Sequence, residues 1–138
     1  MDKLGLMSCF ILIITFLSCS KKPKTYFNIP LLIGKNIDET RKILNLKNQK
    51  DPSDTSITHW DDYYEVEGRI LMINYNPKTR KTGEISLIYP KGYSSKNEIL
   101  KAGNLQENTQ SYTCEVSTDI WSLSPFTSYN GIRINAIN

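Results

Sequence analysis

The fold is decided by residues 60–75, which read WDDYYEVEGRILMINY. Polar and apolar side chains alternate with a period of two on both sides of Glu67-Gly68, which is typical of β-strands. The alternation places on one face Trp60, Asp62, Tyr64 and Val66 before the turn and Leu71, Ile73 and Tyr75 after it. The stretch therefore predicts a β-hairpin that reverses at Glu67-Gly68. Because Tyr63 and Tyr64 fall on opposite faces, both rings cannot lie in the core.

Three further segments show the same alternation. Residues 84–89 return with Ile, Leu and Tyr aligned at every second position, and Pro90-Lys91-Gly92 is expected to end that strand. Residues 110–117 alternate again, and Asn130-Gly131 is expected to turn the chain into a last strand over 132–137. The sequence thus predicts four or five antiparallel strands.

Two helix starts are marked by an N-cap residue followed three positions later by an acid, the capping-box pattern. The pairs are Asn36 with Glu39 and Ser95 with Glu98. The first predicts a helix over 37–46, and the second a helix of about two turns that ends at Gly103 in the left-handed conformation. The expected architecture is α+β, an antiparallel sheet of four to five strands with two short helices packed on one face.

The first 18 residues differ in composition from the rest. One lysine precedes a run over 10–17 that is apolar except for Thr15, which is too short to cross a bilayer and is typical of a secretion signal. Ser18-Cys19 follows directly, so the segment resembles the signal of bacterial lipoproteins, although Phe16 and Leu17 depart from the usual residues. The resemblance implies that residues 1–18 are cleaved as a lipoprotein signal peptide and that Cys19 is lipidated.

The same resemblance implies where the protein resides. A lipid on Cys19 would attach the chain to a membrane of the cell envelope, with residues 19–28 as a basic tether and 29–138 as a single domain. Ser20 stands where some bacteria use Asp to retain lipoproteins in the inner membrane, which favours the outer membrane, facing the periplasm or the surface. Cys9 would be discarded and Cys114 would be the only thiol left, so no intrachain disulfide is expected.

Residues 33–44 carry a second resemblance. An apolar residue and Gly34 lead into the capped amphipathic helix, an arrangement similar to the opening of PASTA repeats and of the SmpA/OmlA outer-membrane lipoproteins. The Leu-Gly-x-Pro sequence that usually closes this helix in the SmpA/OmlA type is absent, because Leu44-Asn45-Leu46 stands there. The resemblance implies only a helix followed by strands. The whole chain also resembles many small bacterial lipoproteins whose activity is uncharacterised.

Catalytic chemistry is weakly signalled. The chain has a single histidine, His59, and no Gly-x-Ser-x-Gly elbow to supply a nucleophile for it. Cys114 alternates with apolar residues on an expected core face, where a thiol is unreactive. One histidine and one thiol do not assemble a zinc site, and no phosphate-binding glycine loop is present. We therefore expect no catalytic residues, no metal and no cofactor.

Charge and aromatic content indicate the kind of partner. Seventeen Lys and Arg against fourteen Asp and Glu give a net charge of +3, which is too small for a nucleic-acid-binding surface. Tyrosine and tryptophan are favoured in protein interfaces and at sugar-stacking surfaces. We take as candidate partner-binding residues Trp121, Phe126 and Tyr129 in an irregular segment, together with Tyr63. The partner would be an envelope protein or a glycan.

The sequence thus favours a non-catalytic binding or scaffold module, held by its lipid at the envelope. Two alternatives remain open. The first is a periplasmic inhibitor or immunity-type protein that blocks a toxin or hydrolase. The second is a small extracytoplasmic hydrolase that uses His59 with Asp61 or Asp62.

Overall fold

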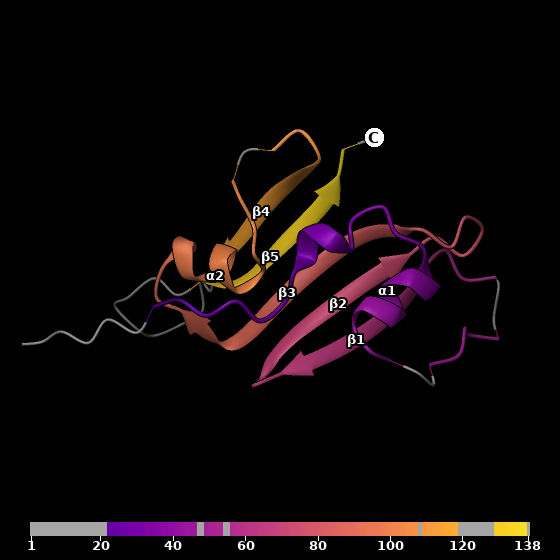
Figure 1. Cartoon of the computed structure of the whole chain (residues 1–138), viewed down its shortest axis with the longest axis horizontal. Helices are drawn as coiled ribbons and strands as arrows, with labels where there is room; N and C mark the ends of the chain where they lie inside the picture. Colours follow the sequence, from indigo (N-terminus) through magenta and orange to yellow (C-terminus); the bar gives the residue numbers. More distant parts are fainter. Residues whose placement is uncertain (1–21, 47–48, 54–55, 108, 119–128, 138) are drawn as a thin grey trace, which may run out of the picture.

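A computed structural model describes residues 22–46, 49–53, 56–107, 109–118 and 129–137. These contain five strands, two α-helices and one 3₁₀ turn (Figure 1). The strands are β1 (Trp60–Val66), β2 (Arg69–Tyr75), β3 (Thr82–Tyr93), β4 (Tyr112–Thr118) and β5 (Tyr129–Ala136), and the helices are α1 (Ile37–Ile43) and α2 (Lys96–Ala102). All strand pairs are antiparallel, in the order β1-β2-β3-β5-β4. The predicted α+β architecture is confirmed.

The hairpin of β1 and β2 forms as predicted. Glu67 and Gly68 both have positive φ, 50° and 74°, as a two-residue turn of type I′ requires. Trp60 pairs with Tyr75 at the far end of the hairpin. Tyr64 is 8% exposed and Tyr63 is 60% exposed, as the alternation predicted. Val66, predicted on the core face, is 40% exposed, because it lies next to the turn at the end of the hairpin.

Both predicted helices are present, with different ends. The capping box of α1 is complete, because Glu39 N–H donates to Asn36 Oδ1 and Asn36 N–H donates to Glu39 Oε2. α1 stops at Ile43, earlier than predicted, because Asn45 has a φ of 61° and ends the helical hydrogen bonding. In α2 the Ser95 hydroxyl accepts from Glu98 N–H, whereas the Glu98 carboxylate turns back to Ser94 instead of Ser95.

The predicted left-handed cap at Gly103 is wrong. Gly103 has a φ of −93°, and the left-handed residue is Asn104, with a φ of 54°. A side chain at position 103 would require its neighbours to move, because a Cβ there would lie 2.8 Å from Ile29 Cδ1 and 2.8 Å from Leu105 Cδ1. The glycine permits close approach between the end of α2 and the N-terminal segment.

Two strand ends also differ from prediction. Pro90 does not end β3, which runs on to Tyr93. Among the described residues, positions 89–92 have no partner in register on either side, so the missing N–H of proline removes no ladder bond. Asn130-Gly131 does not form a turn but lies inside β5, since Tyr129 already pairs with Tyr93 and Gly131 with Ile88. The segment between β4 and β5 lies outside the described residues.

Both helices cover the same face of the sheet (Figure 1). Their apolar side chains pack with the inward positions of all five strands, and the fully buried members include Leu71, Ile73, Tyr75, Leu87, Ile99, Ile132 and Ile134. The backbone N–H groups of Tyr26 and Phe27 both donate to the carbonyl of Ala102, and Phe27 is buried. Residues 26–28, predicted as tether, therefore belong to the body. No helix among the described residues is long and apolar enough to span a membrane.

Candidate functional site

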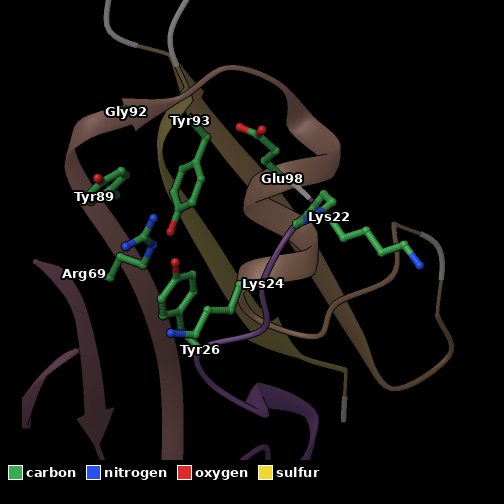
Figure 2. A pocket seen from close by; sticks show the side chains of 9 residues that line it. Lys22, Lys24, Tyr26, Arg69, Tyr89, Gly92, Tyr93 and Glu98 are labelled. Atoms are coloured by element: carbon green, nitrogen blue, oxygen red, sulfur yellow. The ribbon is translucent and has the colours of Figure 1, made fainter. Parts of the chain in front are cut away.

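A pocket of about 380 Å³ lies where the N-terminal segment crosses the ends of β2 and β3 beside α2 (Figure 2). Its walls come from three parts of the chain that are distant in sequence, namely residues 22–26, Arg69 and residues 89–98. The lining residues are Lys22, Pro23, Lys24, Tyr26, Arg69, Tyr89, Gly92, Tyr93 and Glu98. We call this site the Tyr-Arg pocket.

The local sequence explains why a cation stands at the base of this pocket. Arg69 is the first residue of β2, directly after the tight turn, and it lies at alternate positions with the buried Leu71 and Ile73. The period of two therefore directs its side chain to the helix-covered face. On the neighbouring β3, Tyr89 follows the inward positions of Ile85 and Leu87 and reaches the same face.

The guanidinium of Arg69 is held between aromatic rings. Its central carbon lies 3.8 Å from the ring centroid of Tyr26, 4.0 Å from that of Tyr89 and 5.6 Å from that of Tyr93. The rings of Tyr89 and Tyr93 lie 5.1 Å apart, centroid to centroid. Arginine favours such stacking because its planar cation is weakly hydrated. The faces of the guanidinium are thus occupied, and its N–H edge is the part left for hydrogen bonds.

Two polar atoms of the pocket are buried without a protein partner. Arg69 Nη1 donates to the Glu67 carbonyl at 3.1 Å, but Arg69 Nε makes no hydrogen bond within the described part of the chain. The hydroxyl of Tyr93 likewise has no hydrogen-bond partner within 3.5 Å there, on a residue only 5% exposed. Figure 2 shows the hydroxyl ends of Tyr26 and Tyr93 pointing toward one another beside the guanidinium. Burial raises the pKa of Tyr93 to about 12, although the charge of the neighbouring Arg69 and a weak hydrogen-bonding interaction with it act in the opposite direction.

The rim of the pocket is cationic. Lys22 is exposed, and Lys24 is ion-paired with Glu67 while its Nζ lies 4.9 Å from the ring centroid of Tyr26. The single lining carboxylate, Glu98, accepts from the hydroxyl of Ser94 at 2.7 Å and from its N–H at 2.9 Å. These hydrogen bonds hold the pKa of Glu98 below its usual range, and the bond from the Ser94 hydroxyl has the larger effect. The lining carries three cations and one anion, and Glu67 beside the pocket neutralises Lys24, so a net charge of about +1 remains, which suits an anionic ligand.

A second polar cluster, around Asp62, is structural. Its carboxylate accepts from Arg41 Nε at 2.8 Å and Nη2 at 3.1 Å, from Gln49 Nε2 at 2.8 Å and from the Tyr64 hydroxyl at 3.2 Å. Arg41 Nη1 also donates to Asp51, 2.8 Å away. The acceptor positions of Asp62 are therefore occupied, and the cluster joins α1, the following loop and β1.

The remaining candidates from the sequence are dispersed. The side chain of His59 is 54% exposed, with Nδ1 3.1 Å from Thr58 Oγ1 and Nε2 3.6 Å from Asp61 Oδ2. Asp62, the other carboxylate proposed to act with His59, is ion-paired with Arg41. Cys114 is half-buried, and burial raises the pKa of its thiol. No cluster of three or more metal-ligating side chains occurs in the described ranges.

The predicted partner-binding residues do not converge on one described surface. Tyr63 is on the open face of the sheet, while Tyr129 is half-buried against the core at the start of β5. Trp121, Phe126 and the lipidation residue Cys19 lie outside the described residues. Sequence reasoning missed Tyr26 and Arg69. A usable signal for Arg69 was present, namely a charge at an inward position of a strand.

Comparisons with models of protein families, with curated proteins and with solved structures find no match to this chain.

Proposed function

We propose that the protein is a lipid-anchored, non-catalytic binding module of a bacterial envelope, with the Tyr-Arg pocket as its ligand site. The lipid is carried by Cys19, as Ser18-Cys19 after the apolar run implies. Two or more acyl chains on one residue make membrane attachment stable, since each buried methylene contributes about 0.8 kcal/mol.

The observation that carries the proposal is the position of the pocket relative to that anchor. Lys22 lines the pocket and is only three residues from Cys19. A fully extended chain spans at most about 3.5 Å per residue, so three residues reach about 10 Å. The rim of the pocket would thus be held within about 10 Å of the lipidated residue, a distance comparable to the depth of a headgroup layer.

The pocket also has the character of a binding site. The guanidinium of Arg69, stacked between tyrosine rings, and the buried tyrosine hydroxyl beside it can bind a ligand through hydrogen bonds. Neither group is a nucleophile or a base near neutral pH, which covalent or acid–base catalysis would need. The pKa of Tyr93 is raised by burial to about 12, so its phenol keeps its proton at neutral pH. These features support binding in preference to catalysis.

Metabolic labelling of growing bacteria with palmitate tests the anchor. The wild type is expected to incorporate label and to sediment with membranes, whereas Cys19→Ala is expected to lose the label completely. Cys114→Ala is the matched control, because it removes the thiol of the body and should retain full labelling. Equal labelling of Cys19→Ala and wild type would refute the anchor.

A further inference from the structure

We propose that the Tyr-Arg pocket binds the phosphate group of a phospholipid headgroup in the membrane to which the protein is anchored, with Arg69 and Tyr93 as its hydrogen-bond donors. This inference rests on the proposed function, because the anchor brings the pocket to the membrane surface. It adds the chemical class of the ligand and the side chains that recognise it.

The unpaired buried atoms define what the ligand must offer. Arg69 Nε can only donate a hydrogen bond, and the protonated hydroxyl of Tyr93 donates as well. Buried polar groups are paired in the great majority of proteins, and leaving one unpaired is unfavourable. The missing partner is therefore an acceptor. A single oxyanion with several oxygens can serve both donors.

The charge of the pocket selects an anion over a neutral acceptor. Three of the lining side chains are cationic, of which Lys24 is paired with Glu67, and the carboxylate of Glu98 is already hydrogen-bonded to Ser94. The guanidinium presents a planar fork of N–H groups, which matches phosphate oxygens. The exposed Lys22 at the rim adds long-range attraction to an anionic surface.

The fold leaves a route for the ligand to reach these donors. Tyr26 stacks on Arg69, yet its ring is only partly buried, and its backbone is fixed independently by the hydrogen bond from its N–H to Ala102. Rotation of the ring away from Arg69 would uncover that face of the guanidinium and open a way to its N–H groups without disturbing the backbone. Tyr89 would continue to stack on the other side, 4.0 Å from the guanidinium carbon.

Attachment at Cys19 reduces the affinity that such a site needs. A short tether between the protein and the membrane raises the effective concentration of headgroups at the pocket to roughly the millimolar range. A pocket with two main donors and a weak intrinsic affinity would therefore be occupied at the membrane. Free ligand at micromolar concentration would leave it empty.

The test uses the full lipidated protein in dodecyl maltoside, a detergent without phosphate. Dihexanoyl phosphatidylglycerol is titrated below its critical micelle concentration, and the phosphorus resonance of the lipid is followed by NMR. We expect a saturable shift. Tyr93→Phe removes only the unpaired hydroxyl and should weaken binding about tenfold, the effect of one hydrogen bond to a charged group.

The chain offers a matched control in Tyr75→Phe. Tyr75 is fully buried with an unpaired hydroxyl, like Tyr93, but it does not line the pocket. Its variant should bind the lipid as wild type does. A second arm replaces the lipid by inorganic phosphate, and a headgroup site should bind it much more weakly.

Equal affinity for inorganic phosphate would overturn the assignment to phospholipid and leave a free-phosphate site. No saturable shift, or equal weakening by both tyrosine variants, would overturn the pocket itself. The anchor is judged separately, since palmitate labelling of Cys19 with no headgroup binding would refute only this inference. Headgroup binding by an unlabelled protein would instead refute the anchor.

Discussion

Replacing Asp62 by Asn should destabilise the fold by about 3 kcal/mol, near the lower end of the 3–5 kcal/mol expected when one partner of a buried ion pair is removed. Asp62 has a side chain only 4% exposed and faces the guanidinium of Arg41 with both oxygens. An amide keeps the shape but sets an N–H₂ group against a donor and removes the counter-charge. Asp51 still neutralises Arg41 in part, at 2.8 Å, which keeps the loss toward the lower end.

Thermal unfolding followed by circular dichroism measures this effect. At about 4 °C per kcal/mol for a body of this size, Asp62→Asn should lower the Tm by about 12 °C. Asp38→Asn is the matched control, because Asp38 is also paired with an arginine, Arg80, but its side chain is 74% exposed. An exposed pair contributes about 1 kcal/mol or less, so this control should shift the Tm by at most about 4 °C.

A second comparison separates loss of the charge pair from loss of packing. Changing both partners together, Arg41→Met with Asp62→Leu, should recover most of the lost stability, because no unpaired charge then remains in the core. The reasoning would be refuted if Asp62→Asn melted as the exposed control does. It would also be refuted if the double variant were less stable than either single one.

Two further predictions concern α2. Gly103→Ala should lower the free energy of unfolding by about 1–3 kcal/mol in urea titrations, because the new methyl group overlaps Ile29 and Leu105; an unchanged midpoint would show that both side chains move aside freely. Ser94→Ala should raise the pKa of Glu98 toward its ordinary value and destabilise the protein by about 1 kcal/mol at neutral pH. Since a lowered carboxyl pKa stabilises the fold above the unfolded-state pKa, the difference from wild type should shrink as the pH falls through the folded-state pKa of Glu98, and a pH-independent difference would contradict this cause.

Local features were predictable where short-range chemistry determines them. The turn at Glu67-Gly68, the capping box of α1 and the opposite faces of Tyr63 and Tyr64 depend on neighbouring residues alone, and all were predicted correctly. Gly103 was misread because the reason for its glycine is contact with Ile29, distant in sequence. Asn130-Gly131 was misread because pairing with β3 and β4 outweighs the turn preference of the dipeptide.

The candidate site was the least predictable part. Tyr26, Arg69 and Tyr89 come from three segments, and none carries a motif. Alternation did place Arg69 and Tyr89 on the inward face of their strands. What alternation could not show is that the N-terminal segment returns across that face, fixed by the hydrogen bonds of Tyr26 and Phe27 to Ala102.

The amino-acid sequence by itself determined the period of each strand and the helix starts, since each depends on residues within a few positions of one another; the lipid anchor proposed at Cys19 likewise rests on sequence alone. Tertiary structure alone decided the strand order β1-β2-β3-β5-β4, the pairing of Arg41 with Asp62 and the convergence of tyrosines on Arg69. These long-range contacts are set by the joint burial of a single core and by the pairing of its charges, which no local pattern encodes.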